Sequence, residues 1–328
     1  MKQLDQPAIS VILITPDTYD TVARVVSCLQ VQTARERIEL IIVGAERDNL
    51  LIKQEQLTAF SRYRIVTIGE IRSSAFARAA GARKATAPLV GFVEDHAFPA
   101  PDWAEHLIKE HQHEWAGVAP EILNANPNSH TSWANLFLAH GKWVATEPEG
   151  IRDHLPPHNT VYKREILLAY GQQLDSWLEA EGLMQDDLRS KGHQLYFQTQ
   201  AKMKHLNISA LQPFIIEQYS GGRVFGANRS THWPWWKRMI YIVGSPLIPL
   251  HRLPGLLAMI KQAGRWQELM PLILPSLLFG LTIHSFGEMM GYAFGVGQTQ
   301  ELSTRFEFHH DRYLCARDQN WEQFPIWI

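Results

Sequence analysis

The segment LVGFVEDH, residues 89–96, decides the fold of this chain. Its first five residues form an apolar run of the kind found in strands that are buried on both faces of a sheet. Glu94, Asp95 and His96 follow this run at once. In parallel sheets covered by helices, ligands bind beyond the carboxyl ends of the strands. The segment therefore predicts an α/β fold with a polar site at the end of this strand.

Three more apolar runs lie upstream of this segment and repeat its pattern. They are ISVILI, ELIIV and RIVTI, at residues 9–14, 39–43 and 64–68, and we expect each to be a buried strand. Helical patterns lie between them, at about residues 20–32 and 74–84. This alternation predicts a mainly parallel central sheet with helices on both faces. Thr15 and Glu46 come after the first two runs, so we expect them at the same edge of the sheet as Glu94.

The composition is that of an ordinary globular protein. Of the 328 residues, 45% are hydrophobic and 20% are charged, which excludes a disordered or low-complexity chain. The formal net charge of −2 argues against nucleic acid as a partner. Cys28 and Cys315 cannot form a disulfide framework, so we expect a reducing compartment. The first apolar run is short and follows Asp5, so we expect no signal peptide and a protein that begins in the cytoplasm.

The C-terminal part of the chain differs in composition from the rest. Residues 218–267 contain seven Lys or Arg, four Trp and no Asp or Glu, and nineteen uncharged residues follow at 269–287. Cationic and Trp side chains beside apolar residues are typical of the cytoplasmic interface of a membrane. We therefore expect a helical, membrane-associated region at residues 226–298 and a polar tail at residues 299–328.

Three arrangements of the uncharged run are open from the sequence. Nineteen residues are just enough to span a bilayer, but prolines, a glycine and a histidine interrupt them, at Pro271, Pro275, Gly280 and His284. The run is a surface-lying or re-entrant hairpin, a single membrane span, or an ordinary buried core helix.

The side chains of Glu94, Asp95 and His96 indicate metal chemistry. Carboxylate oxygens suit a hard divalent ion, either Mg²⁺ or Mn²⁺, and the imidazole favours Mn²⁺. Such an ion would bridge the phosphates of a nucleotide diphosphate and neutralise the charge that develops there. The alternative is that these residues cap a helix that starts near Pro101.

Six segments, in their order along the chain, resemble motifs of glycosyltransferase family 2. This family has the nucleotide-diphospho-sugar transferase fold called GT-A. The segments are SVILIT at 10–15, ELIIV at 39–43, SAFARAAG at 74–81, EDH at 94–96, PHNTVYKRE at 157–165, and LEAE at 178–181 with GHQL at 192–195 and then His205. The resemblance covers about residues 9–225, which implies a GT-A domain at residues 1–225.

The resemblance and the physical needs of sugar transfer imply roles for individual residues. The residues expected to bind the nucleotide sugar are Thr15, Glu46, Arg78, Glu94, Asp95 and Arg223. The residues expected on the acceptor side are His158 and Asn159. The expected metal ligands are Asp95, His96 and His205, and the expected catalytic residue is Glu181, as the general base. For Arg223 and His205 a plain structural role is the alternative, and Asp186 and Asp187 are alternative bases.

The chain departs from the family pattern at several motif positions. Gly44 and Ala45 stand where the second strand usually ends in Asp, so Glu46 is the substitute candidate. The helix motif has Ala80 where the family has Asn, and the usual Glu-Asp pair reads Ala-Glu, ending at Glu181. Nucleotide choice and metal dependence rest on these altered positions.

Two functions follow as hypotheses. The first is an inverting glycosyltransferase at the cytoplasmic face of the membrane, held there as a peripheral, monotopic or single-span protein. It would use a nucleotide-diphospho-sugar donor, Mn²⁺ or Mg²⁺, and a lipid, a lipid-linked sugar or a polysaccharide precursor as acceptor. The second is a degenerate GT-A fold that acts as a membrane-bound, non-catalytic nucleotide-sugar-binding or scaffold module. The remaining histidine clusters, at 111–113 and 309–310, are expected to be solvated surface side chains.

Overall fold

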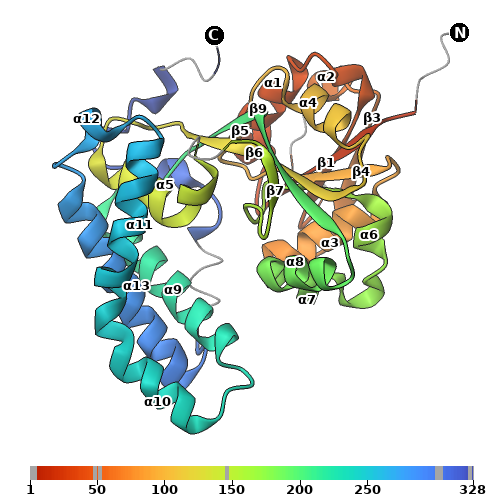
Figure 1. Cartoon of the computed structure of the whole chain (residues 1–328). Coiled ribbons are helices and arrows are strands. Elements are labelled where there is room, and N and C mark those ends of the chain that lie inside the picture. The colour runs from red at the N-terminus through yellow and green to blue at the C-terminus, as the bar shows by residue number, and fades with distance from the viewer. Residues whose placement is uncertain are drawn as a thin grey trace, which may run out of the picture. The chain divides into compact units, whose positions relative to one another are not determined.

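The computed structural model describes residues 6–46, 50, 54–144, 148–299, 306–323 and 327 (Figure 1). The chain forms two compact units. The first unit contains Met1–Leu123, Pro148–His205 and Ile326–Ile328, and the second contains Asn124–Glu147 and Leu206–Pro325. Each unit is therefore built from segments that are distant in the sequence.

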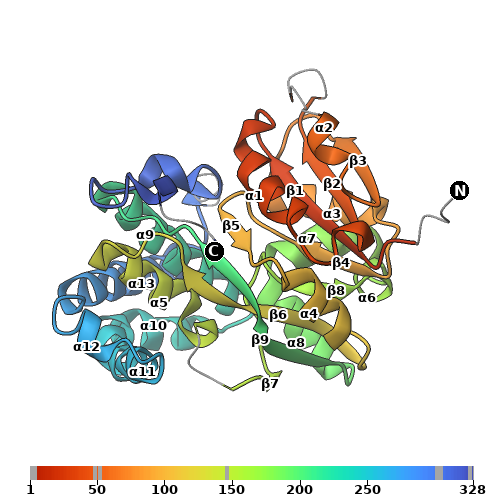
Figure 2. The same ribbon diagram turned by 90° about the horizontal axis from the view of Figure 1, so that it is seen from above.

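The first unit is built on a nine-stranded sheet in the order β3-β2-β1-β4-β8-β6-β9-β5, with β7 also paired to β9 (Figure 2). The strands are β1 (Ile9–Thr15), β2 (Ile38–Gly44), β3 (Arg62–Thr67), β4 (Leu89–Phe92), β5 (Ala97–Pro99), β6 (Trp115–Asn124), β7 (Gly150–Arg152), β8 (Val161–Lys163) and β9 (Gln194–His205). Strands β3, β2, β1 and β4 are parallel, as the alternation of strands and helices predicts. From β8 onward the strands join antiparallel, so the sheet as a whole is mixed.

The helices of the first unit follow the strands they connect. They are α1 (Asp20–Gln30), α2 (Gln54–Leu57), α3 (Ser74–Lys84), α4 (Trp103–Glu110), α6 (Arg164–Leu168), α7 (Leu174–Glu179) and α8 (Glu181–Ser190), with 3-10 turns η1 (Arg35–Arg37) and η4 (Gly171–Gln173). The helices expected at 20–32 and 74–84 are confirmed as α1 and α3. Helix α3 begins where the Ser73 hydroxyl accepts a hydrogen bond from the Phe76 amide. It lies close to the sheet because Gly81 has no side chain: a Cβ there would overlap Ile12.

Burial in the sheet follows the position of each strand. Every residue of β1 and β2 is buried, because these strands have a neighbour on both edges and helices over both faces. Strand β3 lies at the edge of the sheet and is partly exposed. The expectation of a fully buried third strand was therefore wrong, since an edge strand has only one neighbour.

The second unit is helical. Its helices are α5 (His130–His140), α9 (Leu211–Arg229), α10 (Trp235–Gly244), α11 (Ile248–Gln262), α12 (Trp266–Leu269) and α13 (Leu274–Phe294), with 3-10 turns η3 (Gly141–Trp143), η5 (Ser245–Leu247), η6 (His310–Tyr313) and η7 (Trp321–Gln323). Helices α9 and α13 pack directly on each other (Figure 1). A Cβ on Gly222 or Gly226 of α9, or on Gly287 or Gly291 of α13, would overlap the backbone of the facing helix. The glycines therefore permit backbone contact between the two helices.

The uncharged run at 269–287 lies mainly in α13, so one side of it is packed against α9. Among the described residues, one helical stretch is long and apolar enough to cross a membrane, and it is Trp235–Gln262 rather than this run. That stretch comprises α10, η5 and α11 and is largely exposed. The stretch is a candidate membrane span on its length and composition alone.

Candidate functional site

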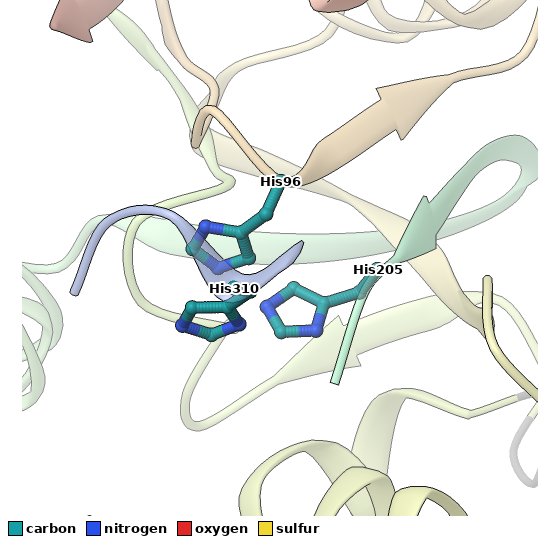
Figure 3. A group of neighbouring side chains, drawn as sticks. All are labelled: His96, His205 and His310. Carbon is teal, nitrogen blue, oxygen red and sulfur yellow. The ribbon is translucent and has the colours of Figure 1, made fainter. Parts of the chain in front are cut away.

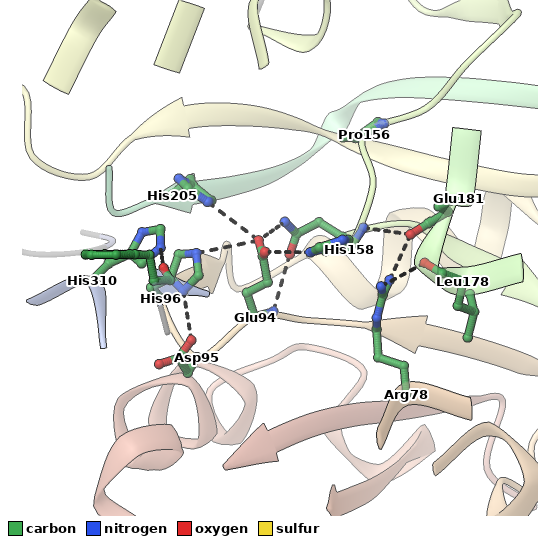
Figure 4. A network of polar contacts seen from close by, with 12 residues as sticks. Arg78, Glu94, Asp95, His96, Pro156, His158, Leu178, Glu181, His205 and His310 are labelled. Atoms are coloured by element: carbon green, nitrogen blue, oxygen red, sulfur yellow. Dashed lines mark hydrogen bonds and ion pairs between the residues drawn. The ribbon is translucent and has the colours of Figure 1, made fainter. Parts of the chain in front are cut away.

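The carboxylate of Glu94 lies at the centre of a polar network just beyond the end of β4 (Figure 4). Its Oε2 accepts a hydrogen bond from Asn159 Nδ2, and its Oε1 lies 3.2 Å from His158 Nδ1. Two more imidazoles face the same carboxylate: His205 Nε2 lies 3.5 Å from Oε2 and His96 Nε2 lies 3.7 Å from it. The segment 94–96 thus gathers partners from two other parts of the first unit, the loop at 158–159 and the end of β9.

The environment of Glu94 holds it in its charged form. Burial by itself raises the pKa of this carboxyl. The charge of His96 and hydrogen bonds from His158 and His205 outweigh that effect and keep the pKa well below its usual range. Glu94 is therefore a carboxylate surrounded by nitrogen donors.

His96 and His205 come together because β5 pairs with β9. In that pairing Ala97 is the partner of His205, which places His96, one residue earlier, beside it. The two rings meet edge to face with their centroids 4.7 Å apart (Figure 3). Asp95 Oδ1 lies 2.7 Å from Nδ1 of His96. One ring nitrogen of His96 is thus held by Asp95, while the other faces Glu94.

His310, which Figure 3 also labels, belongs to the second unit. Its ring nitrogens lie 2.7 Å from the Leu206 carbonyl and 2.9 Å from the Phe306 carbonyl. His310 is buried, and so is His111 of the first unit. The expectation that both clusters are solvated was therefore wrong for these two side chains, because each imidazole has a backbone carbonyl partner in the interior.

The loop that carries His158 and Asn159 is held in an unusual conformation. His158 has a φ of 71°, in the left-handed region that non-glycine residues rarely adopt. The Thr160 hydroxyl donates to the Pro156 carbonyl over 2.7 Å and closes the loop on itself. Helix α8 fixes the start of the loop, because the Leu155 amide donates to Gln185 Oε1 over 2.9 Å. These bonds offset the strain at His158.

Glu181, at the start of α8, is the second carboxylate of the network (Figure 4). Arg78 Nη1 donates to its Oε2 over 2.8 Å, and the His158 amide donates to the same oxygen over 3.0 Å. The Tyr162 hydroxyl lies 2.8 Å from Oε1. Arg78 Nη2 also donates to the Leu178 carbonyl over 3.1 Å. The Glu181 side chain is only 1% exposed.

Glu94 and Glu181 are thus linked through one residue. The His158 amide bonds to Glu181, and its imidazole bonds to Glu94. The two carboxylates that the sequence singles out therefore converge on the same loop. They do so although 87 positions separate them in the sequence, counted as 181 − 94.

Asp186 and Asp187, the alternative bases, lie outside this network on α8. Asp187 accepts a hydrogen bond from the Tyr170 hydroxyl over 2.6 Å and pairs with Lys191 at 2.6 Å. Asp186 pairs with Arg189 at 3.3 Å, with its side chain half exposed. Both carboxylates have local surface partners.

The remaining predicted residues occupy three different places. Thr15 is buried at the end of β1, beside Gly44 of β2, and its hydroxyl donates to the Thr18 carbonyl. Glu46 is exposed two residues beyond β2, at the same edge of the sheet. Arg223 lies on α9 of the second unit, where its Nε donates to the Gly295 carbonyl over 2.9 Å.

Sequence reasoning missed Tyr162 and Gln185. Gln185 Nε2 donates to the Tyr162 hydroxyl over 2.8 Å, and that hydroxyl contacts Glu181. Burial first, and then the charge of Glu181, raise the pKa of Tyr162 well above its usual range, so it remains a neutral donor. The only signal for Tyr162 was its place in the segment 157–165, and Gln185 lies one turn beyond Glu181 on the same helix.

One part of the chain matches the model of a known protein family. Residues 10–171 match the family described as Glycosyl transferase family 2. The matched stretch contains Glu94, His158 and Asn159 and ends before Glu181 and His205. None of the curated proteins compared with the chain matches it.

Two of the solved structures that are similar to the chain match it at low sequence identity. One is described as the crystal structure of GalNAc-T7 with UDP, GalNAc and Mn²⁺. Its TM-score is 0.48 at 14% identity, over 62% of this chain and 44% of that one. The other is described as the crystal structure of S. aureus TarS 1–349. Its TM-score is 0.47 at 12% identity, over 88% of this chain and 91% of that one. This chain thus spans less than half the length of the first.

Proposed function

Residues 10–171 belong to glycosyl transferase family 2, and from this premise we propose that the protein transfers a sugar from a nucleotide-diphospho-sugar to a hydroxyl acceptor. The observation that carries the proposal is the bonded link from Glu94 through His158 to Glu181. At the Glu94 end, the link offers a site for a leaving diphosphate. At the Glu181 end, it offers a carboxylate for proton transfer. Transfer needs both groups at a fixed separation, and the loop at 155–160 supplies it.

On the donor side, we propose that Glu94, His96 and His205 hold a divalent metal ion. Glu94 Oε2 lies 3.7 Å from His96 Nε2 and 3.5 Å from His205 Nε2. Mixed oxygen and imidazole donors suit Mn²⁺ better than Mg²⁺. Asp95 is assigned to orient His96 through its other ring nitrogen, as carboxylates beside metal-binding histidines commonly do. When bound, the ion would neutralise charge on the departing diphosphate.

On the acceptor side, we propose Glu181 as the general base and His158 and Asn159 as acceptor contacts. A single in-line displacement would then invert the anomeric carbon: the acceptor oxygen bonds to it, the diphosphate leaves, and Glu181 takes the hydroxyl proton. Glu181 is 1% exposed and is bonded to the loop that contains His158. An acceptor therefore reaches its oxygen only when this loop moves.

The nucleoside contacts, the acceptor and the location are also proposed here. Thr15, Glu46 and Arg223 are proposed for the nucleotide, and a lipid, a lipid-linked sugar or a glycan precursor is proposed as acceptor. We place the reaction at a membrane surface, because the exposed stretch Trp235–Gln262 is apolar and lies in a segment without Asp or Glu. The division into residues 1–225, 226–298 and 299–328 stays a prediction.

The test is turnover and binding by the purified full chain. We expect hydrolysis or transfer from one member of a panel of nucleotide-diphospho-sugars with Mn²⁺, and a rise in melting temperature with that donor. Glu94→Gln should lose both effects, whereas Glu114→Gln, at a side chain that is 99% exposed, should keep them. Binding without turnover would favour the non-catalytic module, and the absence of both would contradict the proposal.

A further inference from the structure

A continuous stripe of exposed apolar side chains runs along α10, η5 and the start of α11. It consists of Trp235, Trp236, Met239, Ile240, Val243, Leu247 and Leu250, which we call the apolar stripe. Steps of three and four residues keep these side chains on one side of the helical stretch. Trp235 is 77% exposed, Val243 is 74% exposed and Leu250 is 68% exposed. Soluble surfaces rarely expose so many large apolar side chains together.

The opposite side of the same stretch is attached to the second unit. Arg252 Nη1 of α11 lies 2.6 Å from Glu288 Oε1 of α13, whose side chain is fully buried. Trp233, just before α10, stacks on Tyr292 of α13 with the ring centroids 5.9 Å apart. The stretch is therefore amphipathic: one side is anchored to α13, and the other carries the apolar stripe.

Lys237 and Arg238 lie in α10, between Trp236 and Met239 of the apolar stripe. Lys237 Nζ lies 4.1 Å from the centre of the Trp233 ring, and the Arg229 guanidinium lies 4.9 Å from the centre of the Tyr241 ring. Arg238 donates to the Ser230 carbonyl over 3.0 Å. The segment 218–267 holds seven Lys or Arg and no Asp or Glu, so no acid of this segment neutralises them. The surface thus combines apolar, aromatic and positive groups.

We propose that the apolar stripe lies in the plane of a membrane interface and binds anionic phospholipids. This inference rests on the membrane location proposed for the enzyme and specifies its partner and mode. Apolar side chains enter the boundary between headgroups and acyl chains, Trp rings lie at the headgroup level, and Lys and Arg meet lipid phosphates. A second copy of the chain does not fit as the partner, because two such faces would bring like charges together without acids between them.

The geometry favours binding in the plane over crossing. The stretch Trp235–Gln262 is long enough to cross a membrane, but it carries the apolar stripe on one side and is attached to α13 on the other, whereas a membrane-spanning helix is apolar all round. Pro246 lies in η5, between α10 and α11. Pro249 lies in the first turn of α11, and Pro254 lies inside that helix. Arg252 in mid-stretch is paired with Glu288, which keeps α11 against α13.

The test is sedimentation of the full chain with vesicles of phosphatidylcholine, with and without phosphatidylglycerol. We expect binding to the anionic vesicles that falls as salt is raised, and little binding to the neutral ones. The double variant Trp235→Ser/Val243→Ser should weaken binding about tenfold or more, because two large apolar side chains leave the contact. Ile151→Ser, which removes an apolar side chain that is 53% exposed on β7, should bind like the unaltered protein.

Three further readings complete the test. Trp fluorescence should be quenched by lipids brominated near the headgroup more than by lipids brominated at the chain ends, and the reverse order would overturn in-plane binding. Circular dichroism of the double variant should match the unaltered protein. Equal binding to neutral vesicles, or self-association without lipid binding, would overturn the proposal. Hydrolysis of the nucleotide sugar in the absence of vesicles reports on the enzyme separately, so failure of the two proposals can be distinguished.

Discussion

Arg78 and Glu181 form a buried ion pair, with 2.8 Å between Arg78 Nη1 and Glu181 Oε2, that ties helix α3 to helix α8. Their side chains are 4% and 1% exposed. A charge so far from water needs a partner, so each residue fixes the position of the other. Because the His158 amide also bonds to Glu181, this ion pair supports the loop that reaches Glu94.

Removal of Arg78 should be costly to stability. Arg78→Met leaves the Glu181 carboxylate buried without its cation, and the loss expected for such a change is about 3–5 kcal/mol. The measurement is the free energy of unfolding in urea. Arg83→Met on the same helix is the control: its ion pair with Asp175, at 3.9 Å, is partly exposed and should contribute about 1 kcal/mol or less. Equal losses for the two variants would contradict the structural role of Arg78.

Substitution of Glu181 distinguishes a base from a structural anchor. Glu181→Gln keeps a carbonyl oxygen for the His158 amide but cannot accept the acceptor proton. If Glu181 is the base, kcat should fall by about 10²–10⁴ while donor binding by thermal shift is retained. Asp186→Asn, five residues further along α8 and half exposed, is the matched control and should leave kcat unchanged. If Glu181→Gln turned over substrate as fast as the unaltered protein, Glu181 would not be the base and would act only as the ion-pair partner of Arg78.

Metal binding should depend on the two imidazoles that face Glu94. We expect the protein to bind Mn²⁺ more tightly than Mg²⁺, since two of the proposed donors are nitrogen. His96→Ala and His205→Ala should each abolish binding seen by Mn²⁺ electron paramagnetic resonance, and Asp95→Asn should weaken it about 10- to 100-fold. His106→Ala, at a histidine on α4 that lies outside the network, is the control. Tight binding after loss of either imidazole would refute the proposed ligand set.

His111 should make stability depend on pH. Burial lowers the pKa of this imidazole from 6.5 to about 4, and its Nε2 lies 3.1 Å from the Val161 carbonyl. The unfolded chain then binds a proton more readily than the folded chain. The stabilisation is therefore complete above about pH 6.5 and is lost as the pH falls toward 4, by about 3 kcal/mol in all. In His111→Gln this part of the pH dependence should vanish; an unchanged slope would contradict the assignment.

The contact between α9 and α13 should tolerate no side chain at its glycines. Gly287→Ala would place a Cβ against the backbone of Tyr219 and Arg223, so we expect a loss of about 1–3 kcal/mol or more in thermal unfolding. Gly255→Ala is the control, because a Cβ at that position of α11 meets open space. That variant should be neutral or gain up to about 1 kcal/mol from helix propensity. Similar losses at both positions would show that close packing is not the cause.

The parallel half of the sheet was predictable because its signals are local. Runs of apolar residues such as 9–14, 39–43 and 89–93 lie in strands almost as the pattern indicates. The antiparallel strands β6, β7 and β9 were not assigned, because β6 and β9 contain polar and charged residues among their apolar ones. The exposure of β3 was also not predicted, because the sequence of one strand does not show whether that strand lies at the edge or in the middle of the sheet.

By itself, the sequence determined where polar groups follow buried strands, and hence that Glu94, Asp95 and His96 stand at a strand end. Strand and helix periodicity depend on neighbouring residues, which a sequence displays. Only the tertiary structure decided which groups meet: that Arg78 pairs with Glu181 across 103 positions, and that His158 bonds to both carboxylates. It also decided that the apolar run at 269–287 packs through glycines while the stretch at 235–250 is exposed. Such partnerships depend on how distant segments pack, because burial of a charge or an apolar side chain is set by what folding places around it.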